Sequence, residues 1–257
     1  MNIERIPALN DNYVFLLWDE AQRVAAVVDP AEAEPILGKL QELDLELVAI
    51  FNTHHHGDHV GGNKSLVREF PRLCVYGGEQ DRGRIPGQQV FLQEGDLVSF
   101  AGREATVYFI PGHTRGHIAY YFPSQSSAEA GELFCGDTIF AGGCGRLFEG
   151  TPAQMVESIG KLRQLPDDTR VWCAHEYTLS NLKFAITIEP DNLQLQTRFE
   201  QVKRDRAKDI PTVPSLLGLE KQTNPFLRWD SPAIQSVAGL SDPARVFGKI
   251  RGMKDLF

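Results

Sequence analysis

The stretch Thr53-His54-His55-His56-Gly57-Asp58-His59 decides how this 257-residue chain is interpreted. The chain has seven histidines, and all of them lie in three short places: four in this stretch, then His113 with His117, and finally His175. A single histidine is more often a structural residue than a ligand. Because the histidines here are clustered and accompanied by an aspartate, we expect a metal site.

Each of these places directly follows a β-rich run of sequence, and so does Asp137. In layered α/β folds, ligands usually bind at the edge where strands end. We therefore expect four strands to deliver His and Asp side chains to one sheet edge. The runs and the groups that follow them are 47–51 before His54, 105–110 before His113, 133–135 before Asp137 and 170–173 before His175.

The number of candidate ligands exceeds what one ion needs. Zinc prefers about four ligands, and a catalytic zinc keeps one position for water. A pair of ions that shares one carboxylate and one hydroxide accommodates the whole set, so we expect a dinuclear site. We expect supporting roles for His55 and His117. The candidate ligands are His54, His56, Asp58, His59, His113, Asp137 and His175.

Composition excludes several classes of function. The net charge of −8 gives no basic excess for a phosphate backbone, so we expect no nucleic-acid partner. No segment approaches the roughly 18 apolar residues of a membrane span, and the first residues do not resemble a secretory leader, so we expect a cytoplasmic protein without a membrane partner. The four cysteines form no C-x-x-C pair. A nucleophilic role for Cys144 is the minor alternative, because no unassigned histidine remains to activate it.

Two kinds of sequence pattern divide the chain. The first part alternates β-rich runs with a helical pattern over 32–43, which implies a layered α/β core. After His175, helical patterns dominate, with prolines between them. We therefore expect a catalytic unit over 1–175 and a helical unit over 176–257. Besides the four runs above, the expected strands are 13–18, 24–28, 73–76 and 118–122, and the expected later helices are 179–188, 193–208 and 232–239.

The metal-binding pattern resembles that of the metallo-β-lactamase superfamily. The resemblance rests on the stretch 53–59 followed by Gly112-His113, Gly136-Asp137 and His175. It implies an α+β fold, the αββα four-layer sandwich, here followed by a C-terminal helical domain. The superfamily hosts hydrolases of several kinds as well as sulfur dioxygenases, so the fold alone does not select the reaction.

Further segments are similar to glyoxalase II, the hydroxyacylglutathione hydrolase family, over nearly the whole chain. These segments are Asp11-Asn12-Tyr13, 142–150, 174–184 and 251–255. The resemblance implies that His54, His56 and His113 hold one ion, that Asp58, His59 and His175 hold the other, and that Asp137 bridges them. It also implies glutathione-binding roles for Arg146, Phe148, Tyr177, Arg251 and Lys254.

One of these positions departs from the family pattern. Some members have a tyrosine where this chain has Phe148, so the aromatic face is kept and a hydroxyl donor is lost. The cationic residues suit glutathione because it carries carboxylates, which guanidinium and ammonium groups bind by charge-assisted hydrogen bonds.

The resemblance implies hydrolysis of S-(2-hydroxyacyl)glutathione, typically S-D-lactoylglutathione, to glutathione and D-lactate, the second step of methylglyoxal detoxification. A hydroxide shared by the two ions would attack the thioester, with Asp58 and Asp137 as the catalytic carboxylates. The alternatives are a glutathione-persulfide dioxygenase and another thioesterase or lactonase of the same fold. We expect a monomer with two divalent ions, zinc before iron or manganese, because imidazole and carboxylate accept all three metals.

Overall fold

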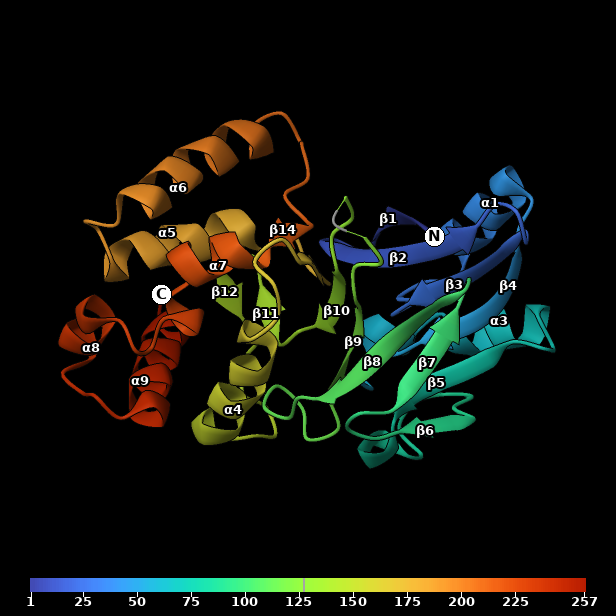
Figure 1. Ribbon diagram of the computed structural model, residues 1–257, viewed down its shortest axis with the longest axis horizontal. Coiled ribbons are helices and arrows are strands. Elements are labelled where there is room, and N and C mark those ends of the chain that lie inside the picture. The colour runs from blue at the N-terminus through green and yellow to red at the C-terminus, as the bar shows by residue number, and fades with distance from the viewer. Residues whose placement is uncertain (127) are drawn as a thin grey trace.

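The computed structural model describes residues 1–126 and 128–257, and two six-stranded sheets form its centre (Figure 1). The sheets pack face to face and helices cover their outer sides, as in the expected αββα sandwich. Both sheets mix parallel and antiparallel neighbours. A further group of helices, orange to red in Figure 1, follows the sandwich.

The first sheet contains the strands that lead to the histidine-rich stretch. Its order along the sheet is the order along the chain, antiparallel from β1 to β3 and parallel from β3 to β6. The strands are β1 (Asn2–Ala8), β2 (Asn12–Asp19), β3 (Val24–Val28), β4 (Glu46–Phe51), β5 (Cys74–Gly78) and β6 (Val90–Leu92).

The second sheet supplies the strands that precede the other candidate ligands. Its order is β14-β13-β10-β9-β8-β7, with β10 and β13 parallel and the other neighbours antiparallel. The strands are β7 (Leu97–Phe100), β8 (Arg103–Phe109), β9 (Ile118–Phe122), β10 (Glu132–Gly136), β13 (Arg170–Cys173) and β14 (Ser215–Leu216). A separate two-stranded hairpin, β11 (Ile139–Phe140) with β12 (Gly143–Cys144), follows β10. We call it the 139–144 hairpin.

The side chains of β2 point alternately to two buried faces, which explains why the fold has four layers. Phe15 and Leu17 point into the core between the two sheets, whereas Val14 and Leu16 point to the opposite face, where they belong to the same buried cluster as Ile36 of the covering helix. Successive strand side chains point to opposite faces, so a strand that is apolar throughout must be covered on both sides. The fully apolar 13–17 run therefore requires a four-layer arrangement.

The helices divide between the two outer faces and the C-terminal region. On the first sheet lie α1 (Glu34–Leu43) and α3 (Asn63–Glu69), and the short α2 (Gly57–Val60) and η1 (Glu79–Asp81) lie in its loops. The helix α4 (Pro152–Arg163) packs on the second sheet. The C-terminal region contains α5 (Thr178–Ile188), α6 (Leu193–Arg206), α7 (Leu217–Thr223), η2 (Pro225–Leu227), α8 (Pro232–Ala238) and α9 (Pro243–Asp255).

The expectation of a single sheet edge was wrong. β4 belongs to the first sheet, whereas β8, β10 and β13 belong to the second. Because the sheets pack face to face, their strand ends meet at one end of the sandwich. Backbone hydrogen bonds join the sheets there: the amide of Ile118 donates to the carbonyl of Thr53 (2.9 Å), and the amide of Tyr13 donates to the carbonyl of Ala174 (2.6 Å).

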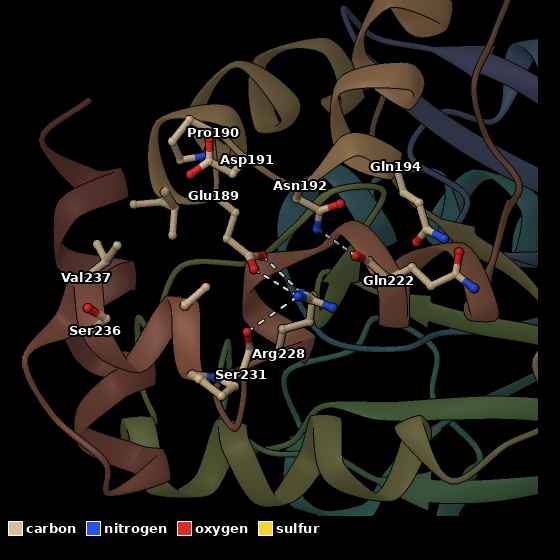
Figure 2. A pocket seen from close by; sticks show the side chains of 13 residues that line it. Glu189, Pro190, Asp191, Asn192, Gln194, Gln222, Arg228, Ser231, Ser236 and Val237 are labelled. Atoms are coloured by element: carbon tan, nitrogen blue, oxygen red, sulfur yellow. Dashed lines mark hydrogen bonds and ion pairs between the residues drawn. The ribbon is translucent and has the colours of Figure 1, made fainter.

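Residues of the C-terminal region line an open cavity of about 640 Å³ that lies apart from the histidines (Figure 2). Its charged centre is Arg228, which donates from Nε and Nη2 to the carboxylate of Glu189 (3.0 and 2.8 Å). Arg228 also donates to the hydroxyl of Ser231 and the carbonyl of Lys221. Since every nitrogen of this guanidinium is already used within the protein, we assign the cavity no ligand.

The core is continuous across the expected unit boundary. One cluster of buried side chains includes Phe134 and Trp172 from the second sheet together with Phe184, Phe226 and Phe247 from the C-terminal region. The division at 175/176 stays a prediction. Among the described residues, no helix combines the length and the apolar character that crossing a bilayer requires.

Candidate metal centre

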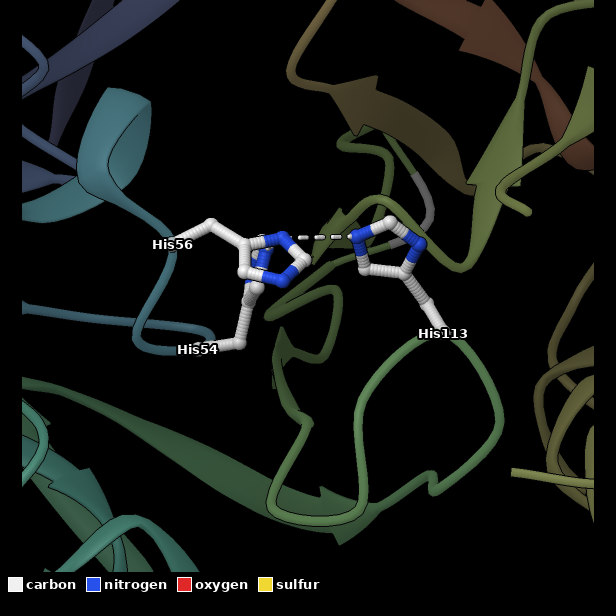
Figure 3. Close-up of side chains that lie close together, drawn as sticks. All are labelled: His54, His56 and His113. Atoms are coloured by element: carbon white, nitrogen blue, oxygen red, sulfur yellow. Dashed lines mark hydrogen bonds between the residues drawn. The ribbon is translucent and has the colours of Figure 1, made fainter. Parts of the chain in front are cut away.

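The first group of candidate ligands consists of three imidazoles from two loops (Figure 3). His54 and His56 follow β4, and His113 follows β8. Nδ1 of His56 lies 3.0 Å from Nε2 of His54 and 3.0 Å from Nε2 of His113. The three nitrogens converge on one point, which is the arrangement that a metal ion requires.

The second group combines one carboxylate with two imidazoles. Asp58 and His59 lie on α2, and His175 follows β13. Oδ2 of Asp58 is 3.5 Å from Nε2 of His59 and 3.4 Å from Nε2 of His175. These groups also lie close enough together to hold an ion.

Asp137 lies between the two groups. Its Oδ1 is 3.4 Å from Nε2 of both His59 and His175, and its Oδ2 is 3.4 Å from Nε2 of His113. Each carboxylate oxygen therefore faces a different group. This geometry suits a carboxylate shared by two ions.

Hydrogen bonds from the outer ring nitrogens fix how the imidazoles are protonated. Nδ1 of His113 can only donate to the carbonyl of Arg146 (2.8 Å), and Nδ1 of His59 and His175 face carboxylates of Asp29 (3.0 Å) and Asp11 (2.8 Å). A neutral imidazole, the form that binds a metal, carries one N–H, so in that form each inner Nε2 presents a lone pair. These histidines are pre-set as ligands.

Through Thr53, Asp29 also determines which nitrogen of His54 carries the hydrogen. The hydroxyl of Thr53 donates to Oδ2 of Asp29 (2.6 Å), so this hydroxyl oxygen is left to accept from Nδ1 of His54 (3.0 Å). Nε2 of His54 therefore also presents a lone pair toward the first group.

The pKa values follow the charge of each group. Burial lowers the pKa of His113 and lowers that of His56 to about 4, so these imidazoles are neutral at neutral pH. Burial also opposes protonation of His175, but its contacts with Asp137 and Asp58 raise its pKa to about 10. The contact with His175 in turn holds the pKa of Asp58 well below its usual range. The second group therefore attracts positive charge.

Buried atoms without partners support the fit of metal ions. Nε2 of His59 and Oδ1 of Asp137 are buried, and neither makes a hydrogen bond to any residue that the structure describes. In the first group, at most one of three convergent nitrogens can donate. Buried lone pairs without a donor cost free energy, which a cation at each group would recover. The His and Asp clusters therefore offer ligand sets for two ions.

His55 and His117 belong to neither group. Nε2 of His117 accepts a hydrogen bond from the backbone amide of Asp137 (3.2 Å), and its Nδ1 lies 3.0 Å from the carbonyl of Ile118. His55 turns away toward Asp81, with Nδ1 3.1 Å from Oδ1. His117 thus helps to orient Asp137, whereas His55 connects its own loop to Asp81 at the end of η1.

A cavity of about 610 Å³ opens beside the metal groups, and we call it the site cavity. His113 and Asp137 form part of its wall, so a bound molecule can reach both groups. All five residues expected to bind glutathione line it as well: Arg146, Phe148, Tyr177, Arg251 and Lys254.

The cationic residues of the site cavity differ in how freely they can bind a ligand. The side chain of Arg146 is 65% exposed, with Nε 3.6 Å from Oδ1 of Asp255. Arg251 is buried, and it donates from Nη1 to the carbonyl of Cys144 (2.9 Å) and from Nη2 to Asp255 (3.0 Å). Lys254 is partly buried, and burial, followed by the charge of Arg251, lowers its pKa to about 8. The cavity is therefore positive although the chain as a whole is acidic.

The aromatic residues connect the cavity to the ligands. Tyr177 stacks on His175 with ring centroids 4.7 Å apart, and the exposed Phe148 packs edge-on against His113 at 5.2 Å. Burial raises the pKa of Cys144 to about 11, which favours the thiol over the nucleophilic thiolate and counts against the alternative role for this residue.

Sequence reasoning missed several residues of the centre. Asp29 and Asp11 orient ligating histidines, and Lys183 and Asn181 line the site cavity. Asp11 lies in a segment that carried the family resemblance, so a signal for it existed. Asp29 is a single aspartate at the end of β3, and no local pattern distinguishes it.

Comparisons with known proteins agree with this geometry. Residues 10–175 match the family model for the metallo-β-lactamase superfamily, and residues 176–257 match the model for the hydroxyacylglutathione hydrolase C-terminus. A hydroxyacylglutathione hydrolase of Crocosphaera subtropica is 70% identical and one of Synechocystis sp. is 68% identical, each over 100% of both chains. Among solved structures, the B3 metallo-β-lactamase BLEG-1 matches with a TM-score of 0.66 at 22% identity, over 88% of this chain and 99% of that one, which shows the shared fold.

Proposed function

Because the chain belongs to the hydroxyacylglutathione hydrolase (glyoxalase II) family of the metallo-β-lactamase superfamily, and is therefore a thioester hydrolase acting on hydroxyacylglutathione, we propose that S-D-lactoylglutathione is its typical substrate. The products would be glutathione and D-lactate. The match over 176–257 favours this reaction over the dioxygenase, the lactonase and other thioesterases of the same fold.

One observation carries the proposal: the two ligand groups share Asp137, and this residue and His113 lie in the wall of a positively charged cavity. The metal groups suit hydrolysis, and the positive cavity suits a peptide that carries carboxylates. We propose that His54, His56 and His113 hold one ion, that Asp58, His59 and His175 hold the second, and that Asp137 contacts both.

The chemistry of the step follows from charge and position. Two divalent ions held by these residues would lower the pKa of a bound water and would polarise the thioester carbonyl. Asp58 and Asp137 remain ionised, so their oxygens accept the hydrogen bonds that orient the attacking water. Asn12 holds Asp58 in place by donating from Nδ2 to Oδ2 (3.1 Å). No side chain needs to act as the nucleophile.

The site cavity would bind the glutathione part. We propose that Arg146 and Lys254 bind its carboxylates, that Phe148 and Tyr177 pack against its peptide groups, and that Arg251 contributes charge from the wall. Holding this part of the substrate places the carbonyl over the ligand groups and removes the entropy cost of finding that position. Phe148 contributes packing without a hydroxyl donor.

Three finer features complete the proposal. We propose zinc as the metal in both sites, because the donors are imidazole and carboxylate, with iron or manganese as alternatives. We propose that the chain works as a monomer in the cytoplasm. Its four cysteines are free, which suits a reducing compartment where glutathione is abundant.

The test is hydrolysis of S-D-lactoylglutathione by the purified protein, together with metal analysis of the same sample. We expect turnover with two equivalents of metal per chain, and light scattering should report one chain per particle. Asp137→Ala should lose much of both metals, because its oxygens face both groups. A rate equal to that of the metal-free background would contradict the substrate assignment, and full metal content in Asp137→Ala would remove this residue from the shared position.

A further inference from the structure

The 139–144 hairpin connects the metal centre to the site cavity. It begins two residues after Asp137, and two of its residues, Phe140 and Cys144, line the cavity. It leads into Gly145, whose backbone packs so closely on Asp137 and His113 that a Cβ there would lie 1.9 Å from the carbonyl oxygen of Asp137. Any displacement of this hairpin therefore changes the wall against which a substrate is held.

Side chains from the C-terminal helices hold the backbone of this hairpin. The Nδ2 group of Asn224 is 3.1 Å from the carbonyl oxygen of Phe140 and 2.9 Å from that of Gly143. Nδ2 of Asn181 donates to the carbonyl of Ala141 (3.1 Å).

Two charged residues complete this support. The carboxylate of Glu220, on α7, accepts from the amide of Gly142 (2.8 Å), and Arg251, on α9, donates to the carbonyl of Cys144 (2.9 Å). Five backbone groups of one short hairpin are thus bonded by four side chains of the C-terminal region.

Glu220 is fully buried and makes this support rigid. One of its oxygens contacts Arg198 and Ser215, and the other accepts from Gly142 and lies 3.0 Å from Nδ2 of Asn224. Arg198 is itself buried and bonded to Thr223 (2.7 Å). A buried charge is tolerated only when it is paired and hydrogen-bonded, and this carboxylate meets both conditions. The network therefore holds one arrangement of the hairpin.

Neither Glu220 nor Asn224 lines the site cavity, and both are fully buried. They cannot touch a bound substrate. Outside the C-terminal region, their hydrogen bonds end on the backbone of residues 140–143, so the direct route by which they can influence the reaction is the position of the hairpin.

We propose that Glu220 and Asn224 are positioning residues that shape the glutathione-binding wall through the 139–144 hairpin. The proposal rests on the proposed function, because it concerns the glutathione part of that substrate. In this view the C-terminal region contributes to specificity in two ways: some of its residues line the cavity, and others hold a segment of the catalytic part in the binding position.

The test compares Asn224→Ala with the matched control Asn192→Ala. Asn192 lies in the C-terminal region as well, where its side chain caps the start of α6. Like Asn224, it donates from Nδ2 to a backbone carbonyl, that of Gln222 (3.0 Å). Its side chain makes no hydrogen bond to the hairpin. We expect KM for S-D-lactoylglutathione to rise about tenfold in Asn224→Ala, the effect of losing one or two net hydrogen bonds, while kcat changes less than about threefold. Asn192→Ala should keep the wild-type KM.

A second substrate separates positioning from general damage. A lactoyl thioester of N-acetylcysteamine lacks the γ-glutamyl and glycyl groups, so its kcat/KM should be almost the same in the wild type and in Asn224→Ala. KM does not depend on the fraction of folded enzyme, so partial misfolding does not imitate this pattern. Glu220→Gln provides a second variant, and its KM for the glutathione thioester should also rise.

The outcomes are distinguishable from a failure of the proposed function. If the wild type does not hydrolyse S-D-lactoylglutathione, the function fails and the inference fails with it. If the wild type is active but both variants keep KM within twofold, or lose activity equally on both thioesters, the positioning role is wrong. Metal content equal to that of the wild type is expected in every variant, because Asn224 and Glu220 are not bonded to any of the seven proposed ligand residues.

Discussion

Lys254 has a charge that depends on pH in the physiological range. Burial removes its ammonium group from water, the charge of Arg251 disfavours it further, and the pKa falls to about 8. The group is therefore cationic below pH 8 and neutral above it. If it binds a carboxylate of glutathione, KM for the glutathione thioester should be low below pH 8 and rise above it.

The matched variant is Lys254→Arg, since a guanidinium stays charged throughout this range. Initial rates between pH 6.5 and 9.5, corrected for spontaneous hydrolysis, should give a KM that rises more steeply in the wild type than in Lys254→Arg. Titration of the substrate's own amino group affects both proteins equally, so the difference reports on Lys254. The same rise in both proteins would show that this ammonium group does not bind the substrate.

At this scale the sequence singled out the proposed ligands, which the structure brings close together, more readily than the residues that orient them. His54 and Asp58 stand in one dense motif after a buried strand, so local pattern was enough. Asp29, which accepts hydrogen bonds from Thr53 and His59, lies 24 and 30 positions away from its partners. An isolated aspartate in a sequence looks like any other, and only the fold shows what it contacts.

In the loop that follows the 139–144 hairpin, Gly145 has no room for a side chain beside the metal centre. A Cβ at this position would lie 1.9 Å from the carbonyl oxygen of Asp137 and 2.9 Å from Nδ1 of His113. The first of these atoms belongs to the backbone and cannot move aside cheaply. Gly145→Ala should therefore displace both residues, lower the metal content and reduce kcat/KM by about 100-fold, the typical effect of an ångström-scale misplacement.

Gly160 on α4 is the matched control, because a Cβ there meets nothing within 4 Å. Gly160→Ala should leave metal content and kcat unchanged and stabilise the helix by about 0.5–1 kcal/mol, because alanine loses less backbone entropy than glycine. Metal analysis and thermal unfolding of the two variants measure these effects. Wild-type metal content in Gly145→Ala would mean that the loop adapts without moving the ligands.

Strands were easier to predict from the sequence than the elements that complete the site. The apolar runs behind β4, β8, β10 and β13 were all identified, because buried strands are continuous hydrophobic stretches. The helix α4 was not predicted, although Thr151 and Gln154 form a capping box at its start. The 139–144 hairpin was not predicted either, because its two-residue strands depend on side chains that follow it by 37 residues or more.

Over the whole molecule, one hydrophobic core joins the sandwich to the C-terminal helices. Phe184 and Phe226 stack with centroids 6.2 Å apart and belong to the same buried cluster as Phe134. The hydrogen bonds to the 139–144 hairpin cross the same boundary. Two family models meet at 175/176, yet the physical contacts give no reason for the two parts to unfold separately. We therefore expect one cooperative unfolding transition, seen at the same temperature by far-UV circular dichroism and by tryptophan fluorescence.

Metal removal should shift this single transition as a whole. The proposed ligands come from loops after β4, β8, β10 and β13, so bound ions tie both sheets together and stabilise only the folded chain. Ligand at 100 times its Kd stabilises the folded state by about 2.7 kcal/mol, and each kcal/mol is worth roughly 2–4 °C for a chain near this size. Stripping the metals with a chelator should therefore lower Tm by roughly 5–10 °C and keep one transition. Asp137→Ala, which faces both groups, should show a much smaller chelator effect. A second transition after chelation would instead show that the sandwich depends on metal while the C-terminal helices fold on their own.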